Sequence, residues 1–71
     1  MFVKREKVEE LRKEFPEGQR VVLVRMDDVT APPKGTEGTV SHVDDVGTIH
    51  VSWDNGSQLG IVYTEDCCRK I

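Results

Sequence analysis

Aromatic side chains are scarce in this sequence, which holds one Trp, one Tyr and two Phe among 71 residues. A groove for proline-rich peptides needs several aromatic side chains, and a methyl-lysine cage needs about three around one cation. Trp53 and Tyr63 alone build neither site, and they offer too little stacking surface for single-stranded RNA. We therefore expect Trp53, which ends an apolar strand face, to belong to the core.

Long apolar runs are also absent. No stretch of about 18 apolar residues is present to span a membrane, and the chain is charged from Lys4 onward, unlike a signal peptide. We expect a cytoplasmic protein. The only cysteines, Cys67 and Cys68, are neighbours, so a disulfide between them would close no useful loop. We expect reduced thiols; a strained redox-sensitive ring or a share in a zinc site are the alternatives.

Positive charge is in the minority. Ten Lys and Arg against thirteen Asp and Glu give a formal net charge of −3, with a pI near 5.3. From residue 16 onward, five basic and nine acidic residues give a net charge of −4. Such a field repels phosphate, so we expect nucleic-acid binding to be disfavoured.

No catalytic motif is recognisable. The sequence lacks a Gly-x-Ser-x-Gly elbow, a phosphate-binding glycine loop and a His-Glu-x-x-His motif. We therefore predict no enzymatic activity and no cofactor. A bulge between Val40 and Val43 would set His42 opposite His50 on the outer face of a hairpin. With the two cysteines these imidazoles would make a four-ligand set, but no Cys-x-x-Cys knuckle orients it, and we predict no metal site.

The residues that are present predict one domain with a helix and a small β barrel. Val8, Leu11 and Phe15 recur at helical spacing, which predicts a helix over residues 3–14, ended by Pro16. This N-terminal part, 1–15, would pack on or flank a barrel formed by 16–71. Short β-branched runs separated by turn residues follow. They predict strands at 20–26, 37–43, 48–53, 57–63 and 69–71.

The connections between these strands are typical of an SH3-like barrel, with an OB fold as the second choice. A long loop over 27–36 comes first, followed by two tight hairpins. The hairpin register sets Val51 opposite Leu59 and Ile49 opposite Ile61, so that aliphatic pairs face the core. The residues that we expect to serve the turns and the core are Gly35, Gly38, Gly47, Trp53, Asp54, Asn55 and Gly56.

A family resemblance rests on several of these segments taken together. They are Met26-Asp27-Asp28, Ala31-Pro32-Pro33 with Gly35-Thr36, Gly38-Thr39-Val40, Val43-Asp44-Asp45 with Gly47, and Ile49-His50-Val51 leading into Trp53-Asp54-Asn55-Gly56-Ser57. From about residue 15 to residue 71 the chain resembles domain of unknown function 4314. The resemblance implies a small bacterial protein, often associated with phage or other mobile elements, without an assigned activity. The family pattern has a Ser and an aromatic residue where this chain has its two cysteines.

Acidic residues are the most distinctive feature of the connections. In an SH3-like barrel three of these loops lie at one end, so three acidic pairs would converge there: Asp27 with Asp28, Asp44 with Asp45, and Glu65 with Asp66. A basic partner or a hard cation such as Ca²⁺ or Mg²⁺ would neutralise them. Alternatively, Asp is simply the usual residue for starting a turn.

We therefore predict a monomeric or weakly self-associating binding module. Its acidic loop end, with His50 nearby, would bind a protein partner. The alternative is a KOW-like nucleic-acid or ribosome contact, which the Gly38-Thr39-Val40 segment permits and the charge opposes. A metal-dependent enzyme is the third possibility, and it lacks a matched acid, base and nucleophile.

Overall fold

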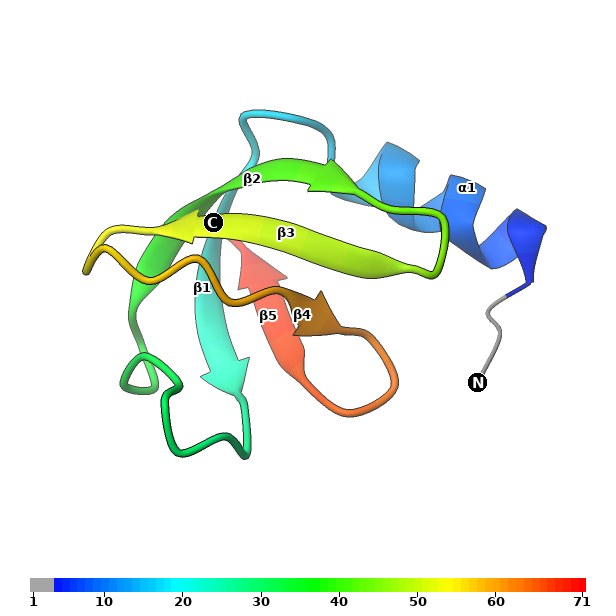
Figure 1. Ribbon diagram of the computed structural model, residues 1–71. Coiled ribbons are helices and arrows are strands. Elements are labelled where there is room, and N and C mark those ends of the chain that lie inside the picture. Colours follow the sequence, from blue (N-terminus) through cyan, green and yellow to red (C-terminus); the bar gives the residue numbers. More distant parts are fainter. Residues whose placement is uncertain (1–3) are drawn as a thin grey trace.

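The fold is mainly β with one N-terminal helix, as the sequence predicted. The computed structural model describes residues 4–71, so the predicted helix start at residue 3 lies outside the described residues. Figure 1 shows the elements in chain order: α1 (Arg5–Glu14), β1 (Arg20–Arg25), β2 (Glu37–Val43), β3 (Thr48–Trp53), β4 (Ile61–Val62) and β5 (Cys67–Lys70). Within residues 4–71, no helix has the length and apolarity needed to cross a membrane.

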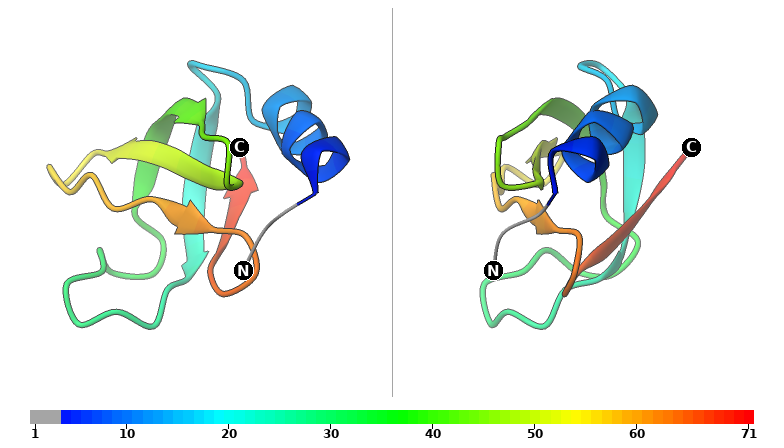
Figure 2. Two further views of the ribbon diagram at one scale, coloured as in Figure 1. Left: turned by 45° about the vertical axis from the view of Figure 1, so that its right-hand side comes forward. Right: turned by 90° about the vertical axis from the view of Figure 1, so that its right-hand side faces the viewer.

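The five strands form one antiparallel sheet in the order β4-β3-β2-β1-β5. The sheet curls so that its two edge strands, β4 and β5, approach each other (Figure 2). Within the described chain no strand ladder joins these two edges. The five-stranded barrel predicted from the sequence is therefore barrel-like but open along one seam.

The seam stays open because β4 is short. The sequence predicted a strand over 57–63, yet only Ile61 and Val62 pair with β3, opposite Ile49 and Thr48. The predicted pairing of Ile49 with Ile61 is confirmed. The predicted pairing of Val51 with Leu59 is wrong, because the Leu59 carbonyl accepts a hydrogen bond from the Trp53 indole N–H at 2.8 Å instead of joining the ladder.

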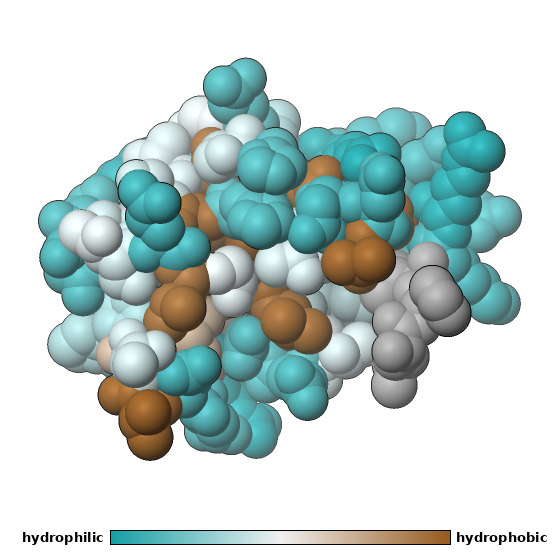
Figure 3. Space-filling view, viewed as in Figure 1, coloured by the Kyte–Doolittle hydropathy of each residue, from teal (hydrophilic) through white to brown (hydrophobic). Residues whose placement is uncertain are grey.

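The core lies inside the curl and extends under α1. Its buried side chains are Val8, Leu11, Phe15, Val21, Leu23, Val40, Val43, Ile49, Val51, Trp53 and Ile61. The first three belong to α1 and the residue that ends it, so the helix completes the core of the sheet. Trp53 is only 2% exposed, which confirms its predicted place in the core. On the face seen in Figure 3, apolar side chains form small separate patches among hydrophilic ones.

Two glycines show why the hairpins need this residue type. Gly56 adopts φ +93° in the turn after β3, where the Trp53 carbonyl accepts a hydrogen bond from its backbone N–H at 2.9 Å. A Cβ atom would be strained at that φ. Gly38 lies in β2 opposite Trp53, where a Cβ would meet Val51 Cγ1 at 2.7 Å and Trp53 Cε3 at 2.8 Å. Gly35 and Gly47 also have positive φ, so all four predicted turn and core glycines occupy positions where a larger residue fits poorly.

We predict that Gly38→Ala lowers the free energy of unfolding by about 1–3 kcal/mol, because the added methyl group overpacks the contact with Val51 and Trp53. Urea denaturation followed by the fluorescence of the buried Trp53 measures this change. Ser52→Ala, an exposed substitution on the neighbouring strand, is the control and should change stability by less than about 0.5 kcal/mol. Equal stability of the two variants would contradict the prediction, because it would mean that the strands around Gly38 accommodate the added methyl group at no cost in free energy.

Candidate functional site

The structure brings part of the predicted acidic set together. Asp27, Glu65 and Asp66 line one hollow of about 400 Å³ with Arg25 and Thr64, where the loop after β1 meets the turn after β4. Arg25 lies 3.3 Å from Asp27 and offsets part of the negative charge. No three His, Cys, Asp or Glu side chains within residues 4–71 are arranged to hold a metal ion. The three carboxylates therefore share a surface without forming a cation cage.

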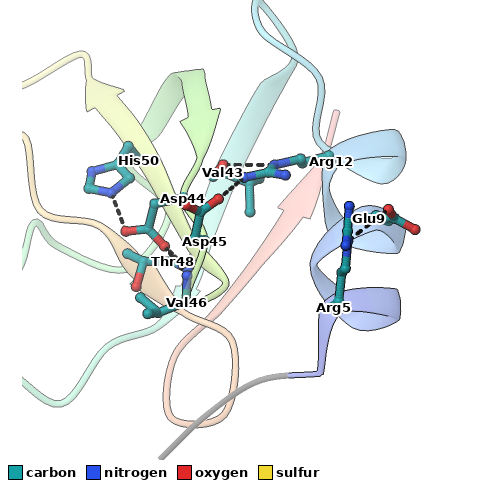
Figure 4. A network of polar contacts seen from close by, with 9 residues as sticks. All are labelled: Arg5, Glu9, Arg12, Val43, Asp44, Asp45, Val46, Thr48 and His50. Carbon is teal, nitrogen blue, oxygen red and sulfur yellow. Dashed lines mark hydrogen bonds and ion pairs between the residues drawn. The ribbon is translucent and has the colours of Figure 1, made fainter.

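The structure places Asp44 and Asp45 elsewhere, on the turn between β2 and β3 beside α1 (Figure 4). Asp45 forms an ion pair of 2.7 Å with Arg12 of the helix, and Arg12 Nε also donates to the Val43 carbonyl at 3.1 Å. The expectation that all three acidic pairs share one rim thus fails for this pair. The helix arginine that holds Asp45 was not part of the sequence argument.

Asp44 organises its own turn. Its carboxylate accepts hydrogen bonds from the backbone N–H groups of Thr48 at 2.9 Å and Val46 at 3.1 Å, and from His50 Nε2 at 2.8 Å. Burial by itself would raise the pKa of Asp44, but the hydrogen bonds from His50, Thr48 and Val46 outweigh it and hold the pKa below the usual 3.8. This aspartate is a structural residue of the hairpin as well as a neighbour of the histidine.

His50 and His42 form a cross-strand pair, as the sequence predicted. A register shift between Val40 and His42 places His42 directly opposite His50. The two imidazole rings stack with centroids 4.4 Å apart and planes inclined by 8°. They lie on the outer face of the sheet, where they line a second hollow of about 270 Å³ with Ser41, Ser52 and Gln58, beside the Val51 backbone.

Asp28 holds the tip of the loop between β1 and β2. Its Oδ1 accepts hydrogen bonds from the Thr30 backbone N–H at 2.8 Å and from the Thr30 hydroxyl at 2.7 Å. These bonds, the backbone one first, lower the pKa of Asp28. Val29 lies between the two residues and is wholly exposed. Sequence reasoning named the aspartate and missed the valine, although Asp-x-Thr is itself a recognisable turn signal.

Asp54, predicted as a turn residue, links the turn after β3 to Arg20 at the start of β1. It accepts two hydrogen bonds from the Arg20 guanidinium, at 2.6 and 2.9 Å. Arg20 also donates to the Thr39 hydroxyl and lies 3.4 Å from Glu37. The hydrogen bonds between them lower the pKa of Asp54 and raise the pKa of Arg20. Asn55 accepts from the Ser57 backbone N–H, so this turn also has a structural role.

A family model described as Domain of unknown function (DUF4314) matches residues 4–71. The chain belongs to the DUF4314 family. This confirms the resemblance drawn from the sequence and extends it into α1. No curated protein and no solved structure matches the chain. For this DUF4314 chain, the case for function therefore depends on its own side chains.

The two cysteines of the DUF4314 chain differ in environment. Cys67 is exposed, whereas Cys68 is half-buried against the core. Burial, and then the charges of Cys67 and Glu14, raise the pKa of the Cys68 thiol to about 11. A thiol with that pKa is about 0.1% thiolate at pH 8, and the thiolate is the reactive form. Cys68 should therefore be inert in the folded protein.

We predict that iodoacetamide at pH 8 alkylates Cys67→Ser, which keeps only Cys68, about tenfold or more slowly than it alkylates Cys68→Ser. Intact-mass spectrometry over time measures both rates. In concentrated urea the two variants should react equally, because the difference comes from the fold. Equal rates under native conditions would contradict the assigned environment of Cys68.

A second prediction concerns Asp44. Asp44→Ala should lower the free energy of unfolding at pH 7 by about 0.5–2 kcal/mol, because two backbone N–H groups and His50 lose their acceptor. A carboxyl group whose pKa is lowered by folding stabilises the fold above its unfolded-state pKa and loses that effect as pH falls through the folded-state value. The difference between wild type and variant should therefore shrink below about pH 4.

Urea denaturation at pH 7 and pH 3 measures this difference. Glu17→Ala, which removes an exposed carboxylate outside the turn, is the control for the change in net charge. If the loss of unfolding free energy in Asp44→Ala is the same at both pH values, the ionised carboxylate is excluded as the source of the stabilisation.

Proposed function

We propose that this chain is a small non-enzymatic binding module that holds a basic protein partner at one end of its barrel. We call this surface the acidic end; it consists of Asp27, Asp28, Val29, Glu65 and Asp66. The observation that carries the proposal is the wholly exposed Val29, which lies in the turn that Asp28 makes with Thr30, on the same loop as Asp27. Bacterial origin and a cytoplasmic location are part of the proposal.

Backbone hydrogen bonds fix the turn of the loop that carries Val29 and tie the end of the loop to β1. The Asp28 carbonyl accepts from the Ala31 N–H at 3.0 Å, and the Leu23 backbone bonds to both Gly35 and Thr36 where the loop returns to β1. A preorganised loop loses little conformational entropy when a partner binds. Burying one valine side chain contributes about 1.5–3 kcal/mol, so Val29 can serve as the apolar anchor of the contact.

The charges of the acidic end define the chemistry of the partner. Asp27, Glu65 and Asp66 face one hollow, and only Arg25 among the residues that line it is basic. Such a surface attracts a partner with Lys or Arg around an apolar pocket and accelerates encounter at low salt. The same charges oppose the phosphate backbone of nucleic acid, which argues against the KOW-like alternative. The hollow pairs no nucleophile with a base, which supports binding over catalysis.

The small, separate apolar patches on the face in Figure 3 support a monomer or a weak self-association. A stable homodimer usually buries a larger continuous apolar area. We therefore expect the partner to be another protein and the contact to be of modest size.

The test compares Val29→Ser with Val46→Ser, which makes the same chemical change on the turn beside α1, where Val46 is 54% exposed. A partner is first captured by the immobilised wild-type chain from its source cell, and its affinity for each purified variant is then measured. We predict that Val29→Ser weakens binding about 10- to 100-fold and that Val46→Ser leaves it unchanged. Asp27→Asn combined with Glu65→Gln should weaken binding and reduce its salt dependence.

Equal affinity of Val29→Ser and wild type would remove the acidic end as the binding surface. If the wild-type chain retards RNA or DNA in a gel at low salt and the complex dissociates as the salt concentration rises, the nucleic-acid alternative is favoured.

A further inference from the structure

We propose that His42 and His50 form a two-imidazole site for a borderline divalent transition-metal ion of the Zn²⁺ type, on the outer face of the β2–β3 hairpin. The site is separate from the acidic end and does not depend on the function proposed above. It uses neither cysteine, since the hollow beside the two rings is lined by β2, β3 and Gln58.

The backbone places the two rings side by side on one face of the hairpin. The register shift before His42 makes it the direct cross-strand partner of His50, and the ring centroids lie 4.4 Å apart. Two nitrogens that share one tetrahedral Zn²⁺, at about 2.0–2.1 Å each, lie about 3.3 Å apart. Because the lone pairs lie in the ring planes, the nearly parallel rings must turn until these lone pairs converge on the ion, and rotation about the side-chain torsions of two surface residues allows this.

Each imidazole has one nitrogen anchored and one left for a ligand. His50 Nε2 lies 2.8 Å from Asp44 Oδ2, and an ionised carboxylate only accepts, so Nε2 carries the proton and Nδ1 keeps the lone pair in the neutral ring. The Ser41 hydroxyl, 2.9 Å from His42 Nδ1, can accept from that nitrogen, and in this tautomer Nε2 carries the lone pair for a metal. A carboxylate that fixes a histidine through its other nitrogen is the usual support of a metal ligand.

The surroundings of the pair suit an ion with an incomplete protein shell. The hollow of about 270 Å³ has room for several water molecules, and Ser41, Ser52 and Gln58 offer hydroxyl and amide groups to them. Imidazole nitrogen is a ligand for Zn²⁺, Cu²⁺ and Ni²⁺, whereas Ca²⁺ and Mg²⁺ require oxygen. Two histidines with water in the remaining positions leave the ion open to a further ligand.

The experiment is a titration of the untagged, ¹⁵N,¹³C-labelled chain with ZnCl₂ at pH 7.5, followed by the NMR signals of the histidine rings. We expect saturable, 1:1 shifts of the His42 and His50 rings, and no such shifts with MgCl₂ or CaCl₂. His42→Gln and His50→Gln should each weaken Zn²⁺ binding about tenfold or more, because one imidazole remains. Lowering the pH to 5.5 should also weaken it, because protons compete for the ring nitrogens.

Two controls keep the result interpretable. The double variant Cys67→Ser with Cys68→Ser should bind Zn²⁺ as the wild type does, and the amide spectra of both glutamine variants should show the native fold. The proposal is overturned by either of two results: ring signals that stay unmoved at millimolar Zn²⁺, or a single glutamine variant that binds as tightly as wild type. Loss of binding in the cysteine variant would overturn it as well and assign the ion to the thiols.

Discussion

The open seam between β4 and β5 is the constraint on which the rest of this structure depends. A sheet whose edges do not pair leaves its core accessible from one side, and here α1 supplies the missing cover. Leu11 of the helix and Phe15, which ends it, line a hollow together with Ile61 of β4 and with Cys67 and Cys68 of β5. The helix thus adds cover to the core beside this seam, although it precedes the first strand and packs mainly against β2.

Two residues of α1 make polar contacts that hold the helix against the sheet. Arg12 binds the Val43 carbonyl and Asp45 on the β2–β3 turn, and Lys7 lies over the Tyr63 ring at 5.1 Å on the other side. No side chain caps the start of the helix at Lys4. Because a ten-residue helix is marginal by itself, these contacts and the buried apolar face fix its position.

The acidic residues, which look alike in the sequence, divide into two groups in the structure. Asp44, Asp45 and Asp54 bind neighbouring side chains or backbone groups within the fold. Asp27 and Glu65 face an open hollow instead, and they keep most of their surface in water. The first group already has partners within the fold, even where a side chain is as exposed as that of Asp45, so a count of charges overstates the number of carboxylates left for a partner.

Features encoded within a few residues could be predicted from the sequence. The spacing of Val8, Leu11 and Phe15 predicted the helix, and local patterns predicted where the first three strands begin. The facing pair of His42 and His50 was predicted from the hairpin and its bulge. Hydrogen bonds and ion pairs made by individual side chains, near or distant in sequence, were the contacts that sequence reasoning missed.

The errors have one physical cause. The β4 strand is shorter than predicted because the Leu59 carbonyl accepts a hydrogen bond from the Trp53 indole. The acidic pairs do not all meet because Asp45 forms an ion pair with Arg12 of the helix. Periodicity describes which face a side chain occupies along its own segment. It carries no information on which side-chain donor reaches a given acceptor, so these contacts could be found only in the structure.

The cover that α1 provides also determines what the protein can tolerate at its N-terminal end. A fragment beginning at residue 16 would keep every strand yet lose three of the eleven buried side chains of the core, Val8, Leu11 and Phe15. Apolar surface uncovered in this way promotes association with other chains. For this small fold the first helix therefore protects the core against aggregation.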